Sequence, residues 1–335
     1  MSHASTHVRG LYWLARDTFQ QSISSSIFWL MLVVSGLCIA VCLSVDVVGT
    51  AQLNRENEQP SFLPRNDPQS DPEKAAAQGV DVVTGEVTIA FGAITVPVSR
   101  DAYDAVRYIQ LILAGLIADT VGVLLTLMWT AAFLPGFLEP RAVSVLLAKP
   151  VSRGYLLIGK FLGVLAFVLF QATVFVGGTW LALGLRTEIW DASYLLCIPL
   201  LLLHFSIFFS FSVLLAVVTR STMVSILGSM AFWFVCWGMN FGRHVLVASP
   251  DLGPELTYGL DWVVEVGYWM LPKPADLTMI LFQALDASNF FASLSVTQAA
   301  HEQFAFMPIL SVGSSLAFMV VVLYASFQQF AATDY

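Results

Sequence analysis

Long apolar runs alternate with short polar stretches along most of this chain. A helix needs about 20 apolar residues to cross roughly 30 Å of hydrocarbon. Six runs reach this length, and charged or turn-forming residues bound each of them. They cover residues 27–48, 108–133, 155–185, 194–218, 223–245 and 306–327. The pattern therefore predicts an all-α polytopic membrane protein with six transmembrane helices.

The segments outside the runs differ in character. Residues 1–25 mix apolar and charged side chains in the manner of an N-terminal interfacial amphipathic helix. Residues 50–107 are polar and predict an extracytoplasmic loop of α/β character. Within it, residues 80–98 alternate as strands do, with a turn signal at Thr84-Gly85, so we expect a small β-hairpin there.

The second half divides in the same way. The first five spans and their loops occupy residues 26–245, and a last span with a short tail occupies 306–335. Residues 246–305 between them carry prolines and scattered acids, which predicts an extracytoplasmic loop with interfacial helices. A seventh span over 262–285 is the alternative. Its charged residues argue against it, because each costs roughly 2.5–3.5 kcal/mol at the centre of a bilayer.

Composition supports a membrane protein. Only 11% of the residues are charged and 57% are hydrophobic, whereas about a quarter are charged in soluble domains. The four cysteines lie inside apolar runs, which predicts small buried side chains. Lys and Arg divide almost evenly between the two sides, so their count does not decide orientation. Acids concentrate in the predicted outer loops, and we expect both termini to be cytoplasmic.

The most distinctive residues lie in the polar segment between the second and third runs, from Phe133 to Gly163. Glu139 is followed by Leu146-Leu147-Ala148-Lys149-Pro150-Val151-Ser152-Arg153, and then by Gly159-Lys160-Phe161-Leu162-Gly163. This order resembles the first cytoplasmic loop of ABC transporter permeases of the type-2 exporter class, the ABC-2-type membrane permease family. One departure is Pro140-Arg141-Ala142, where many members have Gly-Thr after the Glu turn.

The resemblance implies a permease subunit of an ATP-binding cassette transporter that exports a substrate from the cell. Its partners would be a cytoplasmic ABC ATPase subunit, a second permease as homodimer or heterodimer, and the lipid bilayer of a cell membrane such as the bacterial inner membrane; no nucleic acid is expected. ATP and magnesium would be bound by the ATPase, and no cofactor by this chain. Residues 135–154 would form the coupling loop, with Glu139, Arg141, Leu146, Leu147, Lys149, Pro150, Ser152 and Arg153 at the contact.

Two alternatives stay open on the residues alone. The loop could be a plain solvated connector, although a short helix with leucines on one side can also seat in a partner's groove. The chain could also be a membrane-embedded accessory or sensor protein without an ATPase partner. An enzyme is disfavoured, because the sequence has no HExxH motif and no evident Ser/His/Asp set.

One near match to a nucleotide-binding motif is rejected. Gly154 to Phe161 has part of the spacing of a phosphate-binding loop, but Phe161 stands where Ser or Thr must coordinate magnesium. ATP chemistry is therefore expected in another chain. Gly159 and Gly163 instead have the small-xxx-small spacing of a helix-packing contact.

Asp119 is the one acid deep within a predicted span, and such acids default to a functional hypothesis. It would line the transport pathway or serve as a structural hydrogen-bonding group, and the lack of a Lys or Arg partner in the spans favours a structural or cavity-lining role. His204 and Gln171 are expected to bond across helices. Asn240, Arg243 and His244 are expected at a helix end in the interfacial region.

Overall fold

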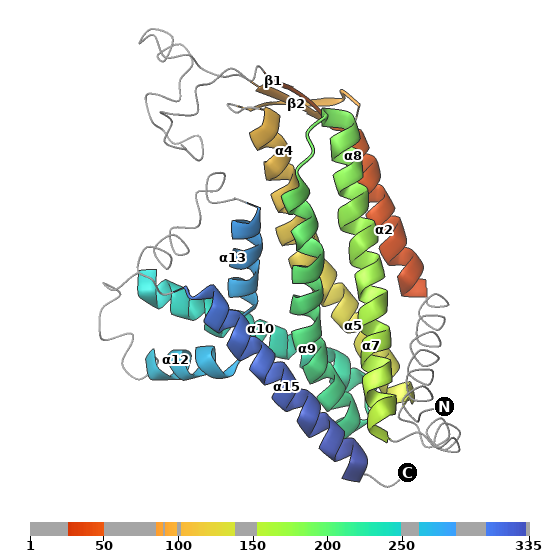
Figure 1. Ribbon diagram of the computed structural model, residues 1–335, viewed down its shortest axis with the longest axis vertical. Coiled ribbons are helices and arrows are strands. Elements are labelled where there is room, and N and C mark those ends of the chain that lie inside the picture. The colour runs from red at the N-terminus through yellow and green to blue at the C-terminus, as the bar shows by residue number, and fades with distance from the viewer. Residues whose placement is uncertain are drawn as a thin grey trace, which may run out of the picture.

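The computed structural model describes residues 26–49, 85–89, 91–98, 102–137, 153–248, 261–285 and 306–332. Helices stand side by side as a bundle with strands at one end (Figure 1). The elements in chain order are α2 (Ser26–Leu43), β1 (Asp46–Gly49), β2 (Gly85–Ile89), β3 (Ile94–Val98), α4 (Ala102–Leu111), η2 (Ile112–Gly122), α5 (Val123–Phe137), α7 (Arg153–Ala172), η3 (Thr173–Gly177), α8 (Gly178–Thr187), η4 (Ala192–Leu196), α9 (Cys197–Thr219), α10 (Thr222–Ala248), α12 (Asp261–Met270), α13 (Pro274–Ala284) and α15 (Pro308–Ala332).

Five helical stretches of the described residues are long and apolar enough to cross a membrane. They match the second to sixth predicted runs, and they cover Ala105–Ala131, Gly154–Thr187, Ala192–Thr219, Thr222–Val247 and Pro308–Ala332. A helix of this length and apolarity can cross the hydrocarbon core of a bilayer. The chain is thus a multi-pass helical membrane protein.

The predicted end of the first span was wrong. The helix stops at Leu43 and its apolar part, Phe28–Leu43, is shorter than the other spans. Asp46–Gly49 leaves the helix as strand β1, because its valines pair with β2 instead of continuing the helical ladder. Residues before Ser26 lie outside the described part of the chain, so the count of six spans stays a prediction.

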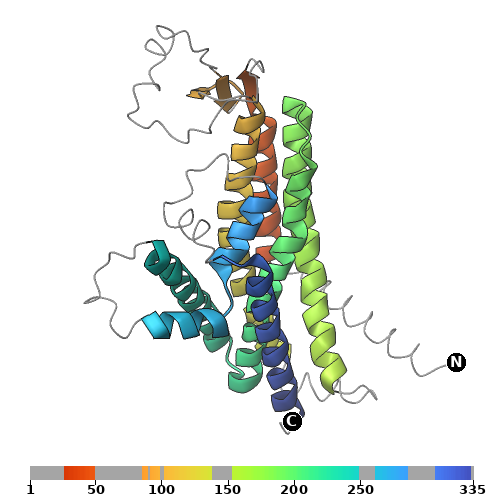
Figure 2. The same cartoon turned by 60° about the vertical axis from the view of Figure 1, so that its left-hand side comes forward.

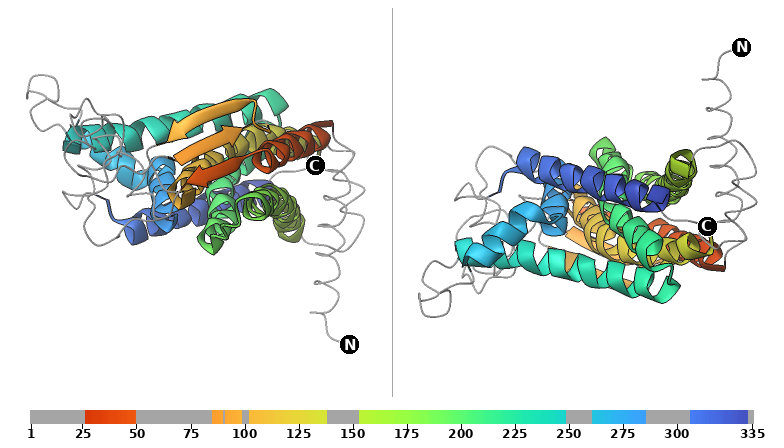
Figure 3. Two further views of the ribbon diagram at one scale, coloured as in Figure 1. Left: turned by 90° about the horizontal axis from the view of Figure 1, so that it is seen from above. Right: turned by 90° about the horizontal axis from the view of Figure 1, so that it is seen from below.

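A three-stranded antiparallel sheet caps one end of the bundle, as the view from above shows (Figure 3). Val87 in the central strand lies opposite Val47 on one side and Val96 on the other. The predicted β-hairpin is present as β2 and β3, but its turn follows Ile89 and not Thr84-Gly85. Gly92 takes φ +94° in that turn, a conformation that glycine adopts without steric cost.

The other end of the bundle carries the tight link between α9 and α10. Arg220 takes φ +51° directly after α9, and α10 begins at Thr222. So short a link leaves only an antiparallel neighbour. The C-terminal ends of α5 and α15 and the N-terminal end of α7 lie at this same end, opposite the sheet (Figure 1).

Two apolar clusters fill the bundle, one above the other. We call the first the link-side cluster; its buried members include Phe28, Leu127, Val168, Phe205, Phe209, Val217 and Phe330. The second is the sheet-side cluster; its buried members include Cys42, Val87, Ala114, Phe175, Leu183, Tyr194, Leu201 and Leu281. Each cluster brings together side chains from several spans, and the van der Waals contacts among them stabilise the association of the spans.

Several buried polar side chains lie near the boundary between the two clusters. On α9, His204 lies between Leu201 of the sheet-side cluster and Phe205 of the link-side cluster. On α2, Ser35 likewise lies between Phe28 of the link-side cluster and Cys42 of the sheet-side cluster. The members that we call the polar layer are Ser35, Asp119, Gln171 and His204, all of them buried. On the second span, the apolar neighbours of Asp119 on both sides, Ala114 and Val123, belong to the sheet-side cluster.

The second and third spans are π-helical at this level. Segment η2 covers Ile112–Gly122 and includes Asp119, and η3 covers Thr173–Gly177, directly after Gln171. A π-helix is rare, and it occurs frequently at functional sites.

The chain between the fifth and last spans contains two short helices in place of a continuous seventh span. Helices α12 and α13 are separated at Leu271–Lys273, and Pro274 opens α13, where the absence of its N–H costs no bond. Helix α13 lies against the bundle, whereas α12 projects to one side (Figure 2). Seen from below, the pair lies between α10 and α15 (Figure 3). We call the two consecutive helices α12 and α13, which meet at an angle, the hairpin; the β-hairpin of β2 and β3 is always named in full.

Candidate functional site

Asp119 has two close hydrogen-bonding partners from other elements. Its Oδ1 lies 2.6 Å from Nδ1 of His204 on α9, and its Oδ2 lies 2.5 Å from Oγ1 of Thr278 on α13. The Asp119 side chain is only 5% exposed. A buried carboxylate is tolerated only when its oxygens are paired in this way.

The hydrogen bond from Trp233 defines the tautomer of His204. Trp233 Nε1–H on α10 donates to Nε2 of His204 at 3.4 Å. Since an indole N–H only donates, Nε2 is the acceptor and the ring proton is on Nδ1, facing Asp119. One hydrogen-bonded chain therefore connects α10, α9, η2 and α13 through Trp233, His204, Asp119 and Thr278.

A second cross-helix bond lies in the same polar layer. Gln171 Nε2 on α7 donates to Ser35 Oγ on α2 at 2.9 Å. The expectation that His204 and Gln171 bond across helices is therefore confirmed. These bonds fix which faces of the spans meet, because each polar group would otherwise be unpaired inside the bundle.

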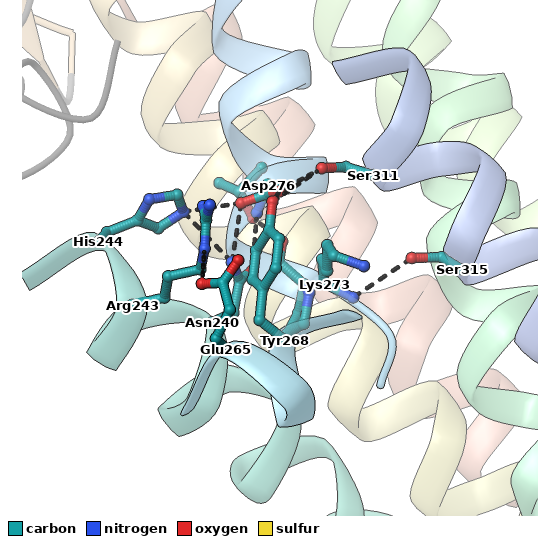
Figure 4. Close-up of polar contacts among 11 residues, drawn as sticks. Asn240, Arg243, His244, Glu265, Tyr268, Lys273, Asp276, Ser311 and Ser315 are labelled. Atoms are coloured by element: carbon teal, nitrogen blue, oxygen red, sulfur yellow. Dashed lines mark hydrogen bonds and ion pairs between the residues drawn. The ribbon is translucent and has the colours of Figure 1, made fainter. Parts of the chain in front are cut away.

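Asp276 on α13 is the centre of a larger buried network (Figure 4). Its Oδ1 accepts hydrogen bonds from Asn240 Nδ2 at 2.8 Å and from His244 Nε2 at 2.7 Å. Its Oδ2 accepts from Tyr268 Oη at 2.7 Å and from Ser311 Oγ at 2.5 Å. The Asp276 backbone N–H also donates to Asn240 Oδ1 at 3.0 Å. The network joins α10, α12, α13 and α15.

The electrostatics of Asp276 follow from these donors. Burial by itself raises the pKa of a carboxyl, but hydrogen bonds from His244, Ser311 and Asn240 outweigh it and hold the pKa of Asp276 below its usual value. Asn240 and His244 are both buried within the protein, and their expected position in the interfacial region stays a prediction. Asp276 supplies the buried partner that draws them inward, and it lies far from them in sequence.

Two cations lie beside the network, on opposite sides of the Tyr268 ring in Figure 4. Arg243 Nε donates to Glu265 Oε2 at 2.8 Å, and its guanidinium lies 4.1 Å from the Tyr268 ring centroid. Lys273 Nζ lies 4.6 Å from the same centroid and donates to Ser314 Oγ at 2.5 Å. The two positive charges of Arg243 and Lys273 equal the two negative charges of Asp276 and Glu265, so the site has no net formal charge.

Lys273 is fully buried, and no carboxylate of the described residues lies within ion-pair distance of it. Burial lowers the pKa of Lys273 to about 8; Arg243 acts in the same direction and Asp276 opposes it. Burial thus destabilises the charged form of Lys273, and the aromatic rings of Tyr268 and Trp269 offset part of this effect.

Helix α13 carries both buried carboxylate contacts. Asp276 and Thr278 are two residues apart, which places them on nearly opposite faces of a helix. Asp276 bonds to α10, α12 and α15, while Thr278 bonds to Asp119 in η2. Helix α13 is therefore a polar bridge between the second span and the last two spans.

Sequence reasoning missed this bridge. Lys273 and Asp276 were noticed only as charges that argue against a seventh span. Thr278, Tyr268 and Ser311 carry no signal that could have marked them, because common hydroxyl residues gain a role only from their neighbours in space.

Most of the predicted coupling residues cannot be placed. Glu139, Arg141, Leu146, Leu147, Lys149, Pro150 and Ser152 lie outside the described residues, and Arg153 is the first residue of α7. Gly159 and Gly163 are buried on α7, and their helix-packing role stays a prediction. Gly154 to Phe161 is helical throughout, so it forms no phosphate-binding loop. In the described part of the chain, no group of three or more His, Cys, Asp or Glu residues could hold a metal ion.

Comparison with known proteins identifies one family. The family model described as ABC-2 family transporter protein matches residues 12–335. No curated protein matches the chain. The match covers all of the spans, residues 138–152 and the hairpin.

Proposed function

The chain belongs to the ABC-2 family of transporter proteins, and from that premise we propose that it couples ATP hydrolysis in a separate ATPase subunit to export of a substrate. It is an integral membrane permease of an ABC transporter. The observation that carries the proposal is the family match over residues 12–335, together with five membrane-crossing helices in the described residues.

The proposal divides the work between two kinds of chain. Family members are membrane-embedded transport components and not catalysts themselves. ATP and magnesium would be held by a cytoplasmic ABC ATPase. A second permease, identical or homologous, would complete the pathway in the lipid bilayer. The helical state of Gly154 to Phe161 supports this division, because the nearest match to a nucleotide motif has no loop geometry.

The coupling loop is proposed at residues 135–154, on the cytoplasmic side of the cell membrane. Both termini would lie on that side, and the sheet would lie outside. Support comes from the shared end of the bundle where α5 stops, α7 starts, α9 links to α10, and α15 stops (Figure 1). Glu139 and Lys149 would make charged contacts with the ATPase surface, and Leu146 and Leu147 would fill its groove.

Co-purification tests the proposal. The full chain, expressed from its native locus with an affinity tag and extracted in mild detergent, is expected to recover an ATPase. Glu139→Arg and Lys149→Glu are each expected to reduce that recovery. Glu188→Lys is the matched charge reversal: Glu188 is exposed at the sheet end, where it ends α8, and it should leave recovery unchanged.

Two outcomes would contradict the proposal. If the wild-type chain recovers no ATPase, the accessory or sensor alternative is favoured. If Glu188→Lys reduces recovery as much as the loop variants do, the loop is not the contact and the charge of the whole surface decides association.

A further inference from the structure

We infer that Thr278 and Asp119 form a latch that holds the hairpin against a hinge in the second span, and that transport opens this latch. Its role in transport rests on the proposed function. The latch itself is a property of this chain alone, and it can be tested without an ATPase.

The contact is built to hold one geometry. Thr278 Oγ1 lies 2.5 Å from Asp119 Oδ2, and the opposite oxygen of the same carboxylate is fixed by His204. Trp233 in turn fixes His204. The Asp119 carboxylate is therefore already oriented to accept the hydrogen bond from Thr278. The Asp119 side chain loses little conformational freedom when that bond forms.

The level of the contact is where the bundle is best able to bend. Asp119 lies within η2, where the ordinary α-helical ladder is replaced by π-helical bonds, and such interruptions are recognised sites of helix kinking. η3 interrupts the third span at the same polar layer.

The hairpin is attached differently on its two faces. Asp276 has four donors from α10, α12 and α15, so this face is bound to the last two spans. The other face meets η2 through one hydrogen bond, from Thr278, and through apolar contact, since Phe282 lies against Gly115 and Leu281 belongs to the sheet-side cluster together with Ala114. The attachment with fewer hydrogen bonds is therefore the one to the second span. The hairpin would move with α10 and α15 when the latch opens.

Hydrogen exchange of the full chain in lipid nanodiscs tests the latch. Thr278→Val keeps the shape of the side chain and removes the donor, so amide exchange across Pro274–Ala284 is expected to rise about tenfold, the effect of losing one hydrogen bond to a carboxylate. Thr278→Ser keeps the hydroxyl and is expected to leave exchange within about twofold of wild type. Exchange in α7 should not change in either variant.

A second pair of variants separates the bond from the charge. Asp119→Asn removes the charge but keeps both contacts, because its Oδ1 can accept from His204 and its Nδ2 can donate to Thr278. Its exchange is expected to lie between that of wild type and that of Asp119→Leu, because only the strengthening of the bonds by the charge is lost. Asp119→Leu has neither group and is expected to match Thr278→Val. The inference is overturned if Thr278→Val exchanges like wild type, if α7 rises equally, or if Asp119→Asn behaves like Asp119→Leu.

Opening of the latch during transport is tested on the complex of this chain with its ATPase. Trapping the wild-type complex with ATP and vanadate is expected to raise exchange across Pro274–Ala284 by about tenfold over the nucleotide-free complex. Unchanged exchange in a complex that hydrolyses ATP would overturn opening during transport. Absence of any ATPase partner would instead count against the proposed function, and the nanodisc result would stand.

Discussion

Asp276→Leu is the sharpest test of the buried network, because the structure predicts which donors it leaves unpaired. Four donors converge on the Asp276 carboxylate. Without it, the hydroxyls of Tyr268 and Ser311 can still pair with each other, since they lie 3.2 Å apart. The N–H groups of Asn240 and His244 cannot both be paired: Asn240 Nδ2 lies 3.2 Å from His244 Nε2 and can donate to it only if the ring proton moves to Nδ1, which has no partner among the described residues. One unpaired buried donor at about 1–3 kcal/mol, added to about 1–2 kcal/mol for the loss of bonds to a charged acceptor, predicts a loss of roughly 2–5 kcal/mol.

Asp276→Asn is predicted to lose much less. Its Oδ1 keeps the bonds from Asn240 and His244, and its Nδ2 can donate to the oxygens of Tyr268 and Ser311 once those hydroxyls rotate. Only the strengthening of the bonds by the charge is lost, about 1–2 kcal/mol. The two substitutions therefore distinguish hydrogen bonding from charge as the source of stability.

Thermal unfolding in lipid nanodiscs, followed by the fluorescence of the nine tryptophans, measures the difference at one scan rate. Asp276→Leu is expected to lower the apparent Tm by at least about 4 °C, and by at least about 2 °C more than Asp276→Asn does. Glu265→Gln is the control; its side chain is 50% exposed, so its loss should be slight. An Asp276→Asn loss equal to that of Asp276→Leu would refute the reasoning, and so would an unchanged Tm in Asp276→Leu.

Two further predictions concern the hairpin. Because the pKa of Lys273 is lowered to about 8 from about 10.4 in an unfolded chain, the unfolded state binds more protons at this residue between these values; the Tm of the wild type relative to that of Lys273→Met should therefore rise from pH 8 to pH 10. A Cβ at Gly115 would overlap the Phe282 ring, so Gly115→Ala is expected to cost about 1–3 kcal/mol in thermal unfolding, whereas Gly313→Ala, with open space around it, should not destabilise and gains up to ~1 kcal/mol. Equal Tm values for the two alanine variants would contradict the close packing of α13 on η2.

Part of the candidate site could be predicted from local pattern. Asp119, Gln171 and His204 were visible because a polar residue inside a long apolar run must find a partner, and the partners were found across helices. Their identity was not visible. Ser35 and Thr278 are ordinary residues 136 and 159 positions away in sequence from the groups that they bond, and nothing local distinguishes them from other hydroxyls.

The β1 strand shows the same limit for the fold. Residues 45–48 continue an apolar run, so hydropathy extends the first span through them. The helix nevertheless ends at Leu43, because Asp46–Gly49 gains a ladder with Gly85–Thr88. Only a segment some 40 residues later in the chain provides that ladder, and a local window cannot register it.

The sequence by itself determined that this chain crosses a membrane repeatedly, where its later spans lie, and which family its polar loop resembles. These follow from run length and from contiguous motifs, because the cost of placing charge in hydrocarbon acts on each segment separately. The tertiary structure decided that α13 lies between the second span and the last two, with one buried carboxylate contact on each face. That arrangement depends on which side chains meet in space, since a buried donor or acceptor is stabilised only by the partner that packing brings to it.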